Sequence, residues 1–302
     1  MYRYKRLLVG LSLNGQDKAT IRYANMVTQM AHSEEIRFVH AVINPDLPEA
    51  IREKYPALLE PFDEAKNRMK AVVRDHFGYP GVRVVCKVVE GFPLTELLCQ
   101  AKEKNTDLIL VGRAALGTRT LLKRLVRKAP CSVFIVPEGT LPKVTKILVP
   151  VDFSENSADA VDVAVAFASA VGTSDISCLH VFHVPLSYHR TGMTYREFAK
   201  VMAEHAANTF EKFISNIDLR GVSVTPIFEP GMDPIEPVVV SISEAIKEQH
   251  ADLLIMGSRG RSAAAAVLLG SVTERLIKMT EIPLLAVKKK GMNLDLVDAM
   301  LR

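Results

Sequence analysis

The run Lys146-Ile-Leu-Val-Pro-Val-Asp152 is a short apolar stretch that ends in a carboxylate, and a near copy stands 140 residues earlier as Arg6-Leu-Leu-Val-Gly-Leu-Ser12. Uninterrupted apolar runs of this length indicate strands that are buried on both faces. Three further pairs of runs repeat in the same order. They are Phe38-Val-His-Ala-Val42 with Cys178-Leu-His-Val-Phe182, Asp107-Leu-Ile-Leu-Val-Gly112 with Asp252-Leu-Leu-Ile-Met-Gly257, and Ser132-Val-Phe-Ile-Val136 with Pro283-Leu-Leu-Ala-Val287. These collinear matches predict two copies of one domain.

Segments with helical periodicity separate the strands. Two of them in the second copy cover residues 159–170 and 234–249, where apolar residues recur at helical spacing. Strands that alternate with helices predict an α/β fold with a doubly wound parallel sheet. The stretch Pro137-Glu-Gly-Thr-Leu-Pro-Lys143 is rich in turn residues, which indicates a linker. We therefore expect tandem α/β domains at residues 1–142 and 143–302.

Composition narrows the class of protein. The 302 residues suffice for two ordinary domains, with 48% hydrophobic and 24% charged residues. No uncharged apolar stretch reaches the length of about 18 residues that a membrane helix needs, and the N-terminus lacks the apolar region of a signal peptide. The four cysteines show no paired spacing, which favours reduced, buried thiols. We expect a cytoplasmic protein that does not bind a membrane, and its net charge of +4 is too small and dispersed to predict nucleic-acid binding.

A glycine-containing segment follows the fourth strand of the second copy. Gly257-Ser-Arg-Gly260 is followed, after nine residues, by Gly270 and Ser271. Gly257 and Gly260 are expected to adopt positive φ and to let the backbone approach a ligand. Ser271 and Glu274 have the spacing of a capping box, which predicts that Ser271 caps the N-terminus of a helix. Free amides and the helix dipole favour an anion there, so the segment predicts a cradle for a triphosphate.

Asp152 ends the first strand of the second copy. In open α/β sheets, ligands bind beyond the carboxyl ends of the strands where the winding reverses. If the first and fourth strands are neighbours, Asp152 and Gly257 face one crevice, and the carboxylate suits a ribose hydroxyl or an adenine amino group. The segment is neither a Walker A loop nor a Rossmann fingerprint, because it lacks Gly-Lys-Ser/Thr and no Gly-x-Gly follows the first strand. Taken singly, each glycine or serine also fits an ordinary turn or helix cap.

The spacing Gly-x2-Gly-x9-Gly-Ser resembles the universal stress protein family, whose ATP-binding members carry Gly-x2-Gly-x9-Gly-Ser/Thr. Residues 146–154 and 179–181 are similar to the family as well, and the resemblance covers nearly the whole chain as two tandem domains. It implies five-stranded parallel sheets of order 3-2-1-4-5, with the two domains related by a pseudo-twofold axis and paired through their fifth strands. It also implies a regulatory role in the stress response, with ATP bound in the second domain and Mg²⁺ bridging its phosphates.

The resemblance also assigns roles to individual residues. Asp152 would contact the nucleoside, while Val181 and Met256 would line the adenine pocket. The glycines and Ser271 would hold phosphates. The full set implied to bind the cofactor is Pro150, Val151, Asp152, Val181, Met256, Gly257, Ser258, Arg259, Gly260, Gly270, Ser271, Val272 and Thr273. We expect no metal ligands and no catalytic residues among the side chains.

The first copy departs from this pattern. Ser12 stands where the second copy has Asp152, and Ala115 falls at the position of Gly260. Six residues are missing between its fourth and fifth strands, inside the predicted phosphate loop. We therefore expect no ATP in this copy, although residues 117–118, with arginines nearby, leave open a smaller anion site.

Binding is favoured over catalysis. His40 and His180 occupy matching strand positions, which indicates buried histidines with satisfied hydrogen bonds rather than metal ligands. No Ser-His-Asp or Cys-His set stands out, so at most weak ATP hydrolysis is expected. The leading hypothesis is an ATP-binding regulatory protein that has an adenine nucleotide and an unidentified protein as partners and that is able to form a homodimer. The alternatives are a slow ATPase or self-phosphorylating enzyme, and a scaffold or small-ligand-binding protein that takes no nucleotide.

Overall fold

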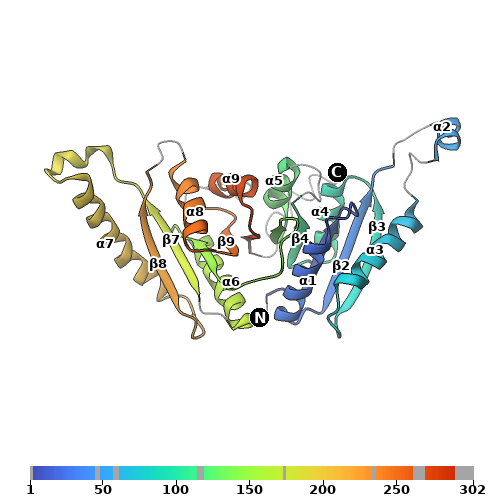
Figure 1. The fold of residues 1–302 in the computed structure, drawn as a ribbon, viewed down its shortest axis with the longest axis horizontal. Helices are drawn as coiled ribbons and strands as arrows, with labels where there is room; N and C mark the ends of the chain where they lie inside the picture. Colours follow the sequence, from blue (N-terminus) through green and yellow to red (C-terminus); the bar gives the residue numbers. More distant parts are fainter. Residues whose placement is uncertain are drawn as a thin grey trace. The chain divides into compact units, whose positions relative to one another are not determined.

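The computed structural model describes residues 3–44, 48–56, 61–113, 119–172, 175–232, 236–260 and 269–289. The chain divides into two compact units between Pro142 and Lys143. Each unit alternates strands with helices (Figure 1). Residues 290–302, which the sequence assigns to the second domain, lie outside the described part of the chain.

The first unit begins with a strand and ends with a strand. Its described strands are β1 (Arg6–Leu11), β2 (Glu35–Val42), β3 (Arg83–Glu90), β4 (Leu108–Gly112) and β5 (Ser132–Val136). Its described helices are α1 (Lys18–Ala31), α2 (Glu49–Lys54), α3 (Phe62–His76), α4 (Pro93–Glu103) and α5 (Arg119–Lys128). The basic residues of α5 share the helix with Leu122, Leu125 and Val126, which are buried.

The second unit repeats this order. Its described strands are β6 (Ile147–Pro150), β7 (Ile176–Phe182), β8 (Val224–Pro230), β9 (Leu253–Gly257) and β10 (Leu284–Val287). Its described helices are α6 (Glu155–Val171), the 3₁₀ helix η2 (Leu186–Thr191), α7 (Tyr195–Ile214), α8 (Pro237–Glu248) and α9 (Ser271–Met279). Among the helices that the structure describes, none combines the length and the apolar character that a membrane span requires.

In each unit the strands form a parallel sheet. The order is β3-β2-β1-β4-β5 in the first unit and β8-β7-β6-β9-β10 in the second. The order 3-2-1-4-5 is therefore confirmed for both units, while their pseudo-twofold relation stays a prediction. Because the winding reverses beside the first strand, right-handed crossovers place α6 and α7 on one face of the second sheet and α8 and α9 on the other. A crevice forms at the carboxyl ends of the strands where this reversal occurs.

The two units differ in how the first and fourth strands pair. In the first unit the pairing of β1 with β4 continues through Gly10 and Val111. In the second unit the pairing of β6 with β9 ends at Leu148 and Leu254. This is two residues earlier along each strand than the last pair of the first unit. Pro150 holds the position of Gly10 and has no N–H to donate to the ladder. The two central strands of the second unit are therefore unpaired at the end where the crevice lies.

Burial explains the apolar runs of the sequence. Every residue of β4 and β5 is buried, as are the first four residues of β9, so these strands are covered on both faces. None of the four cysteines is part of a disulfide. Only Cys131 and Cys178 are buried, so the expectation of burial was wrong for Cys86 and Cys99. Burial raises the pKa of the Cys178 thiol to about 12, which keeps it protonated and unreactive near neutral pH.

Two helices of the second unit begin elsewhere than the periodicity alone predicts. α6 begins at Glu155, ahead of the predicted segment at 159–170, because Ser154 caps it: the Ser154 Oγ accepts a hydrogen bond from the Ser157 amide at 3.3 Å. α8 begins at Pro237, a residue suited to the first helical position because its missing N–H would have no partner there. The start predicted at residue 234 lies outside the described residues.

Candidate functional site

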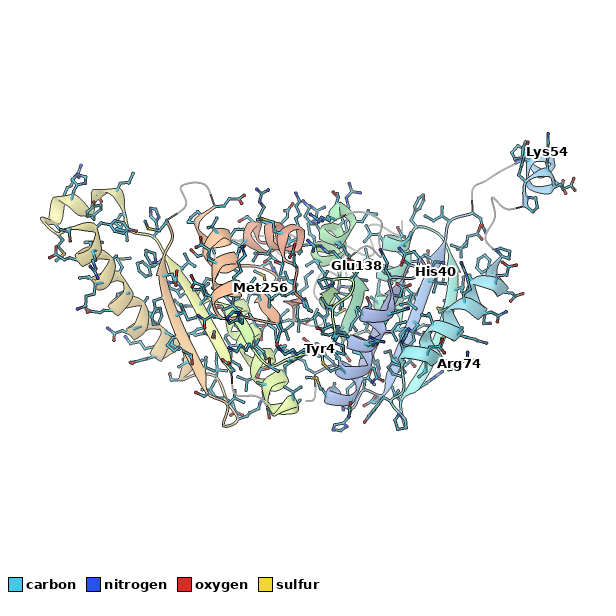
Figure 2. All side chains as sticks on the ribbon, viewed as in Figure 1. Tyr4, His40, Lys54, Arg74, Glu138 and Met256 are labelled. Atoms are coloured by element: carbon cyan, nitrogen blue, oxygen red, sulfur yellow. The ribbon has the colours of Figure 1, made fainter. Side chains whose placement is uncertain are left out.

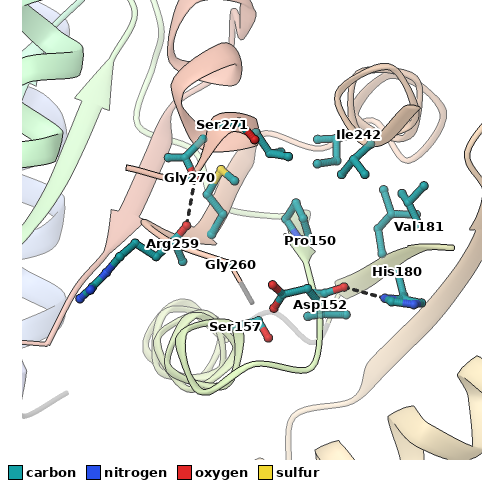
Figure 3. Close-up of a pocket in the computed structure, with 17 residues that line it drawn as sticks. Pro150, Asp152, Ser157, His180, Val181, Ile242, Arg259, Gly260, Gly270 and Ser271 are labelled. Atoms are coloured by element: carbon teal, nitrogen blue, oxygen red, sulfur yellow. Dashed lines mark hydrogen bonds between the residues drawn. The ribbon is translucent and has the colours of Figure 1, made fainter. Parts of the chain in front are cut away.

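A cavity of about 280 Å³ opens at the carboxyl ends of β6, β7 and β9 (Figure 3). These strand ends, the first turns of α6, α8 and α9, and the loop that follows β9 supply its walls. The lining residues are Pro150, Val151, Asp152, Ser157, Leu179, His180, Val181, Val238, Ile242, Met256, Gly257, Arg259, Gly260, Gly270, Ser271, Val272 and Thr273. The cavity therefore occupies the crevice where the sheet reverses its winding.

Twelve of the thirteen residues that the sequence assigns to the cofactor line this one cavity. The exception is Ser258, which is 1% exposed and does not reach the cavity. Whether these residues bind a ligand stays a prediction. Five lining residues were not predicted, namely Ser157, Leu179, His180, Val238 and Ile242. Val238 and Ile242 are four residues apart on α8, a spacing that indicates an apolar helix face without revealing that this face meets a cavity.

The glycines of the motif allow close approach, not positive φ. Gly257, Gly260 and Gly270 all lie outside the left-handed region, so the expectation for Gly257 and Gly260 was wrong. A Cβ on Gly257 would lie 2.9 Å from the carbonyl oxygen of Asn156 at the start of α6. A Cβ on Gly260 would lie 2.8 Å from Oδ2 of Asp152. Gly257 therefore lets α6 pack against β9, and Gly260 brings the loop backbone against the carboxylate.

The N-cap of α9 is Gly270, and Ser271 is the first residue of the helix. The amide of Glu274 donates to the carbonyl oxygen of Gly270 at 2.9 Å. The predicted capping box between Ser271 and Glu274 is therefore wrong, because glycine is itself an acceptable N-cap and adopts the required extended conformation here. No side chain caps this helix, and Ser271 is exposed at its start. The first-turn amides therefore favour an anion at the cavity.

Two hydrogen bonds join the end of β9, at Gly257 and Ser258, to the start of α9, at Gly270 and Thr273. The buried Thr273 donates from Oγ1 to the carbonyl oxygen of Gly257 at 3.1 Å. The amide of Gly270 donates to the carbonyl oxygen of Ser258 at 3.0 Å. These contacts fix the start of α9 against the end of β9, so the helix terminus has a defined position at the cavity.

Asp152 presents one carboxylate oxygen to the protein and the other to the motif loop. Its Oδ1 accepts hydrogen bonds from the amide of Ser154 at 3.1 Å and from the Ser154 Oγ at 2.5 Å, while Oδ2 lies beside Gly260. The next residue, Phe153, has a φ of +63°, which is unusual for a bulky side chain. Its ring stacks on His180 with centroids 4.2 Å apart. This tight turn sets the direction of the carboxylate at the cavity wall.

His40 and His180 make the same contact in the two units. Nδ1 of His180 donates to the carbonyl oxygen of Val151 at 2.8 Å, and Nδ1 of His40 donates to that of Leu11 at 2.9 Å. Hydrogen bonds hold both histidines in place, as expected, but only His40 is buried (Figure 2). The expectation was wrong for His180, which is half-buried because it lines the cavity. Within the described ranges, no three His, Cys, Asp or Glu side chains are grouped so that they could hold a metal ion.

Apolar side chains fill the equivalent place in the first unit. Gly10, Leu97 and Val111 hold the positions of cavity-lining residues of the second unit, at offsets of 140, 145 and 145 residues. A Cβ on Gly10 would lie 2.9 Å from Cδ1 of Leu97 and 3.1 Å from Cγ1 of Val111. The three residues are already in contact, so no space remains between them for an adenine ring.

A buried carboxylate occupies the loop that follows β1. Asp17 is 3% exposed and accepts hydrogen bonds from the amides of Ser12 at 2.9 Å and Leu13 at 2.7 Å. It holds the position of Ser157 of the second unit. A negative charge here disfavours a nearby phosphate. The smaller anion site considered at residues 117–118 lies outside the described residues.

These features define a class of protein. Each unit is a doubly wound α/β domain, and the second has a cavity at its switch point that is bordered by glycines and by an uncapped helix N-terminus. Such cavities suit small phosphorylated ligands.

The chain belongs to the universal stress protein family, whose sequence profile matches residues 3–137 and 143–288. Universal stress protein MJ0577 of Methanocaldococcus jannaschii is 31% identical over 161 residues, which cover 48% of this chain and 96% of that protein. Among solved structures, the functionally unknown protein PA1789 of Pseudomonas aeruginosa PAO1 has a TM-score of 0.68 at 13% identity and covers 98% of this chain and 96% of its own. A universal stress protein from Archaeoglobus fulgidus has a TM-score of 0.59 at 17% identity, covering 94% and 98%. The two structural likenesses support the tandem fold.

Proposed function

We propose that this universal stress protein is an ATP-binding regulatory protein with a single nucleotide site, in its second unit. The observation that supports this most strongly is the convergence of twelve predicted residues, from four separate stretches of sequence, on one cavity. Residues so far apart in the chain meet there only because the sheet order makes β6 the neighbour of both β7 and β9.

The chemistry of the cavity fits an adenine nucleotide. Val181, Ile242 and Met256 offer apolar contacts to a flat base. Asp152 offers an acceptor to a ribose hydroxyl. The uncapped first turn of α9 and the amides beside Gly260 offer donors to phosphates. Mg²⁺ would be held chiefly by the phosphates, which neutralises part of their charge.

Regulation by binding is favoured over turnover. Asp152 supplies the only carboxylate among the described lining residues, and hydrogen bonds from Ser154 already engage its Oδ1. A carboxylate held in this way is poorly placed to activate a water molecule at the far end of a triphosphate. Bound ATP would stabilise the second unit by RT ln(1 + c/Kd), where c is the concentration of free ATP, and a partner protein could respond to the difference between the free and the bound unit.

The asymmetry between the units is part of the proposal. The first unit has continuous β1–β4 pairing, an apolar cluster around Gly10, and the carboxylate of Asp17 in the loop. The apolar cluster leaves no space for the adenine ring, and the charge of Asp17 disfavours the phosphates. We therefore infer that the first unit is a structural partner without ATP.

Replacing Asp152 by asparagine tests the nucleoside contact. Asp152→Asn retains an Oδ1 acceptor for Ser154 but turns Oδ2 into a donor, so a ribose hydroxyl loses its acceptor. We expect ATP affinity to fall about tenfold, with the melting temperature little changed. Isothermal titration calorimetry measures the affinity.

Asp162→Asn is the matched control, because Asp162 lies on α6 in an exposed ion pair with Arg220. It removes the same charge from the same unit and should leave ATP affinity unchanged. Equal affinities for the Asp152 variant and the wild type would contradict the proposed site.

A further inference from the structure

A second cavity adjoins the first. It has a volume of about 440 Å³ and lies between the starts of α8 and α9. Its lining residues are Glu236, Pro237, Val238, Val239, Ser271, Val272, Glu274, Arg275 and Lys278. Val238, Ser271 and Val272 line both cavities. A ligand group that leaves the first cavity over the start of α9 therefore enters the second.

The first cavity provides little positive charge for a polyphosphate. Among its described lining residues, Arg259 has the only guanidinium or ammonium group. Figure 3 shows the Arg259 side chain extending away from Asp152 and Pro150. Among the described residues, backbone amides would then supply most of the contacts to a triphosphate that has several negative charges, so further cations close to Ser271 would strengthen binding.

Among the described residues, Arg275 lies where it could supply this charge. It lies four residues after Ser271, which is one turn further along α9, and it lines the second cavity. Its Nε donates to Oε2 of Glu236, the N-cap residue of α8, at 2.9 Å. The two side chains are 48% and 32% exposed, so water screens the ion pair and an exchange of partners costs little.

We propose that Arg275 exchanges Glu236 for the terminal phosphates of the bound nucleotide and thereby makes the site prefer ATP over AMP. The inference rests on the proposed nucleotide site. A guanidinium can form two parallel hydrogen bonds with a phosphate. The carboxylate of Glu236 at the cavity edge competes with the phosphate for the guanidinium of Arg275. Glu236 thus restrains phosphate binding in two ways, by engaging Arg275 and by placing a negative charge in the second cavity.

The test compares ATP and AMP on the full chain in the presence of Mg²⁺, with calorimetry as the readout. Arg275→Gln should lower ATP affinity about tenfold and leave AMP affinity unchanged. Glu236→Gln should raise ATP affinity about threefold, again without effect on AMP. Lys247→Gln is the matched control, since Lys247 is an exposed cation in the last turn of α8, and it should alter neither affinity.

The two variants should change ATP affinity in opposite directions, which distinguishes a role in nucleotide selectivity from a purely structural role of the ion pair. If the ion pair only braces α8 against α9, both variants should lower the melting temperature and weaken ATP and AMP alike, and this result would overturn the inference. An unchanged ratio of ATP to AMP affinity in Arg275→Gln would also overturn it, while leaving the proposed nucleotide site intact. A wild-type chain that binds neither nucleotide would overturn the proposed function and this inference together.

Discussion

Replacing Gly260 by valine should abolish measurable ATP binding, with a loss of at least about a hundredfold in affinity. A Cβ at this position would lie 2.8 Å from Oδ2 of Asp152, and the two methyl groups of valine would add further volume at the cavity wall. The atom that the added Cβ would meet is a side-chain oxygen and not a backbone atom. The carboxylate can therefore turn aside without unfolding the unit. The variant should therefore fold normally and fail to bind.

Calorimetry with ATP measures the loss, and thermal unfolding checks the fold. Gly78→Val is the matched control, because a Cβ on Gly78 would meet no heavy atom within 4 Å and the residue does not have positive φ. It should bind ATP as the wild type does. ATP bound with wild-type affinity by the Gly260 variant would mean that the cavity is not the nucleotide site.

Replacing Gly257 by alanine should instead destabilise the second unit, by about 2–3 kcal/mol. Its Cβ would lie 2.9 Å from the carbonyl oxygen of Asn156 and 3.0 Å from the carbonyl carbon. Backbone atoms at the start of α6 cannot rotate away, so the helix must shift from β9. The shift would also move the Ser154–Asp152 turn that precedes α6, so ATP affinity should fall as well.

Urea unfolding followed by circular dichroism measures this change. The transition of the Gly257→Ala variant should occur at a lower urea concentration than in the wild type. Gly78→Ala makes the same chemical change where there is free space and should leave the midpoint almost unchanged. A wild-type midpoint for the Gly257 variant would show that the close contact with α6 does not limit this position.

Much of the fold could be predicted because it depends on local patterns. Apolar runs on both faces identify parallel strands, and their repetition identifies two units. The meeting of Asp152 with Gly257 and Gly260 also follows, since it needs only the adjacency of the first and fourth strands. The pattern could thus locate the cavity at one end of one sheet.

The parts that could not be predicted depend on packing between elements. The role of Gly257 became clear only from the position of Asn156 on a neighbouring helix. The capping box failed because Gly270 and Ser271 are both acceptable N-caps, and sequence spacing cannot choose between them. The closure of the first unit by Leu97 requires knowing that a residue of α4 meets Gly10 of β1.

The difference between the two units begins with one position. Pro150 ends the ladder between β6 and β9 early, whereas Gly10 lets β1 and β4 pair further and lets Leu97 pack close to the strand. The second unit therefore has a cavity at its switch point, whereas Leu97 and Val111 fill the space beside Gly10 in the first unit. The two copies thus share one fold, and among the described residues the cavity at the switch point lies in the second copy.

Native mass spectrometry of the full chain with saturating ATP and Mg²⁺ tests this account most directly. We expect one bound ATP per chain, because the cavity proposed to take the nucleotide lies in the second unit among the residues that the structure describes. Two bound ATP molecules per chain would contradict the asymmetry between the units. No bound ATP would contradict the nucleotide site itself.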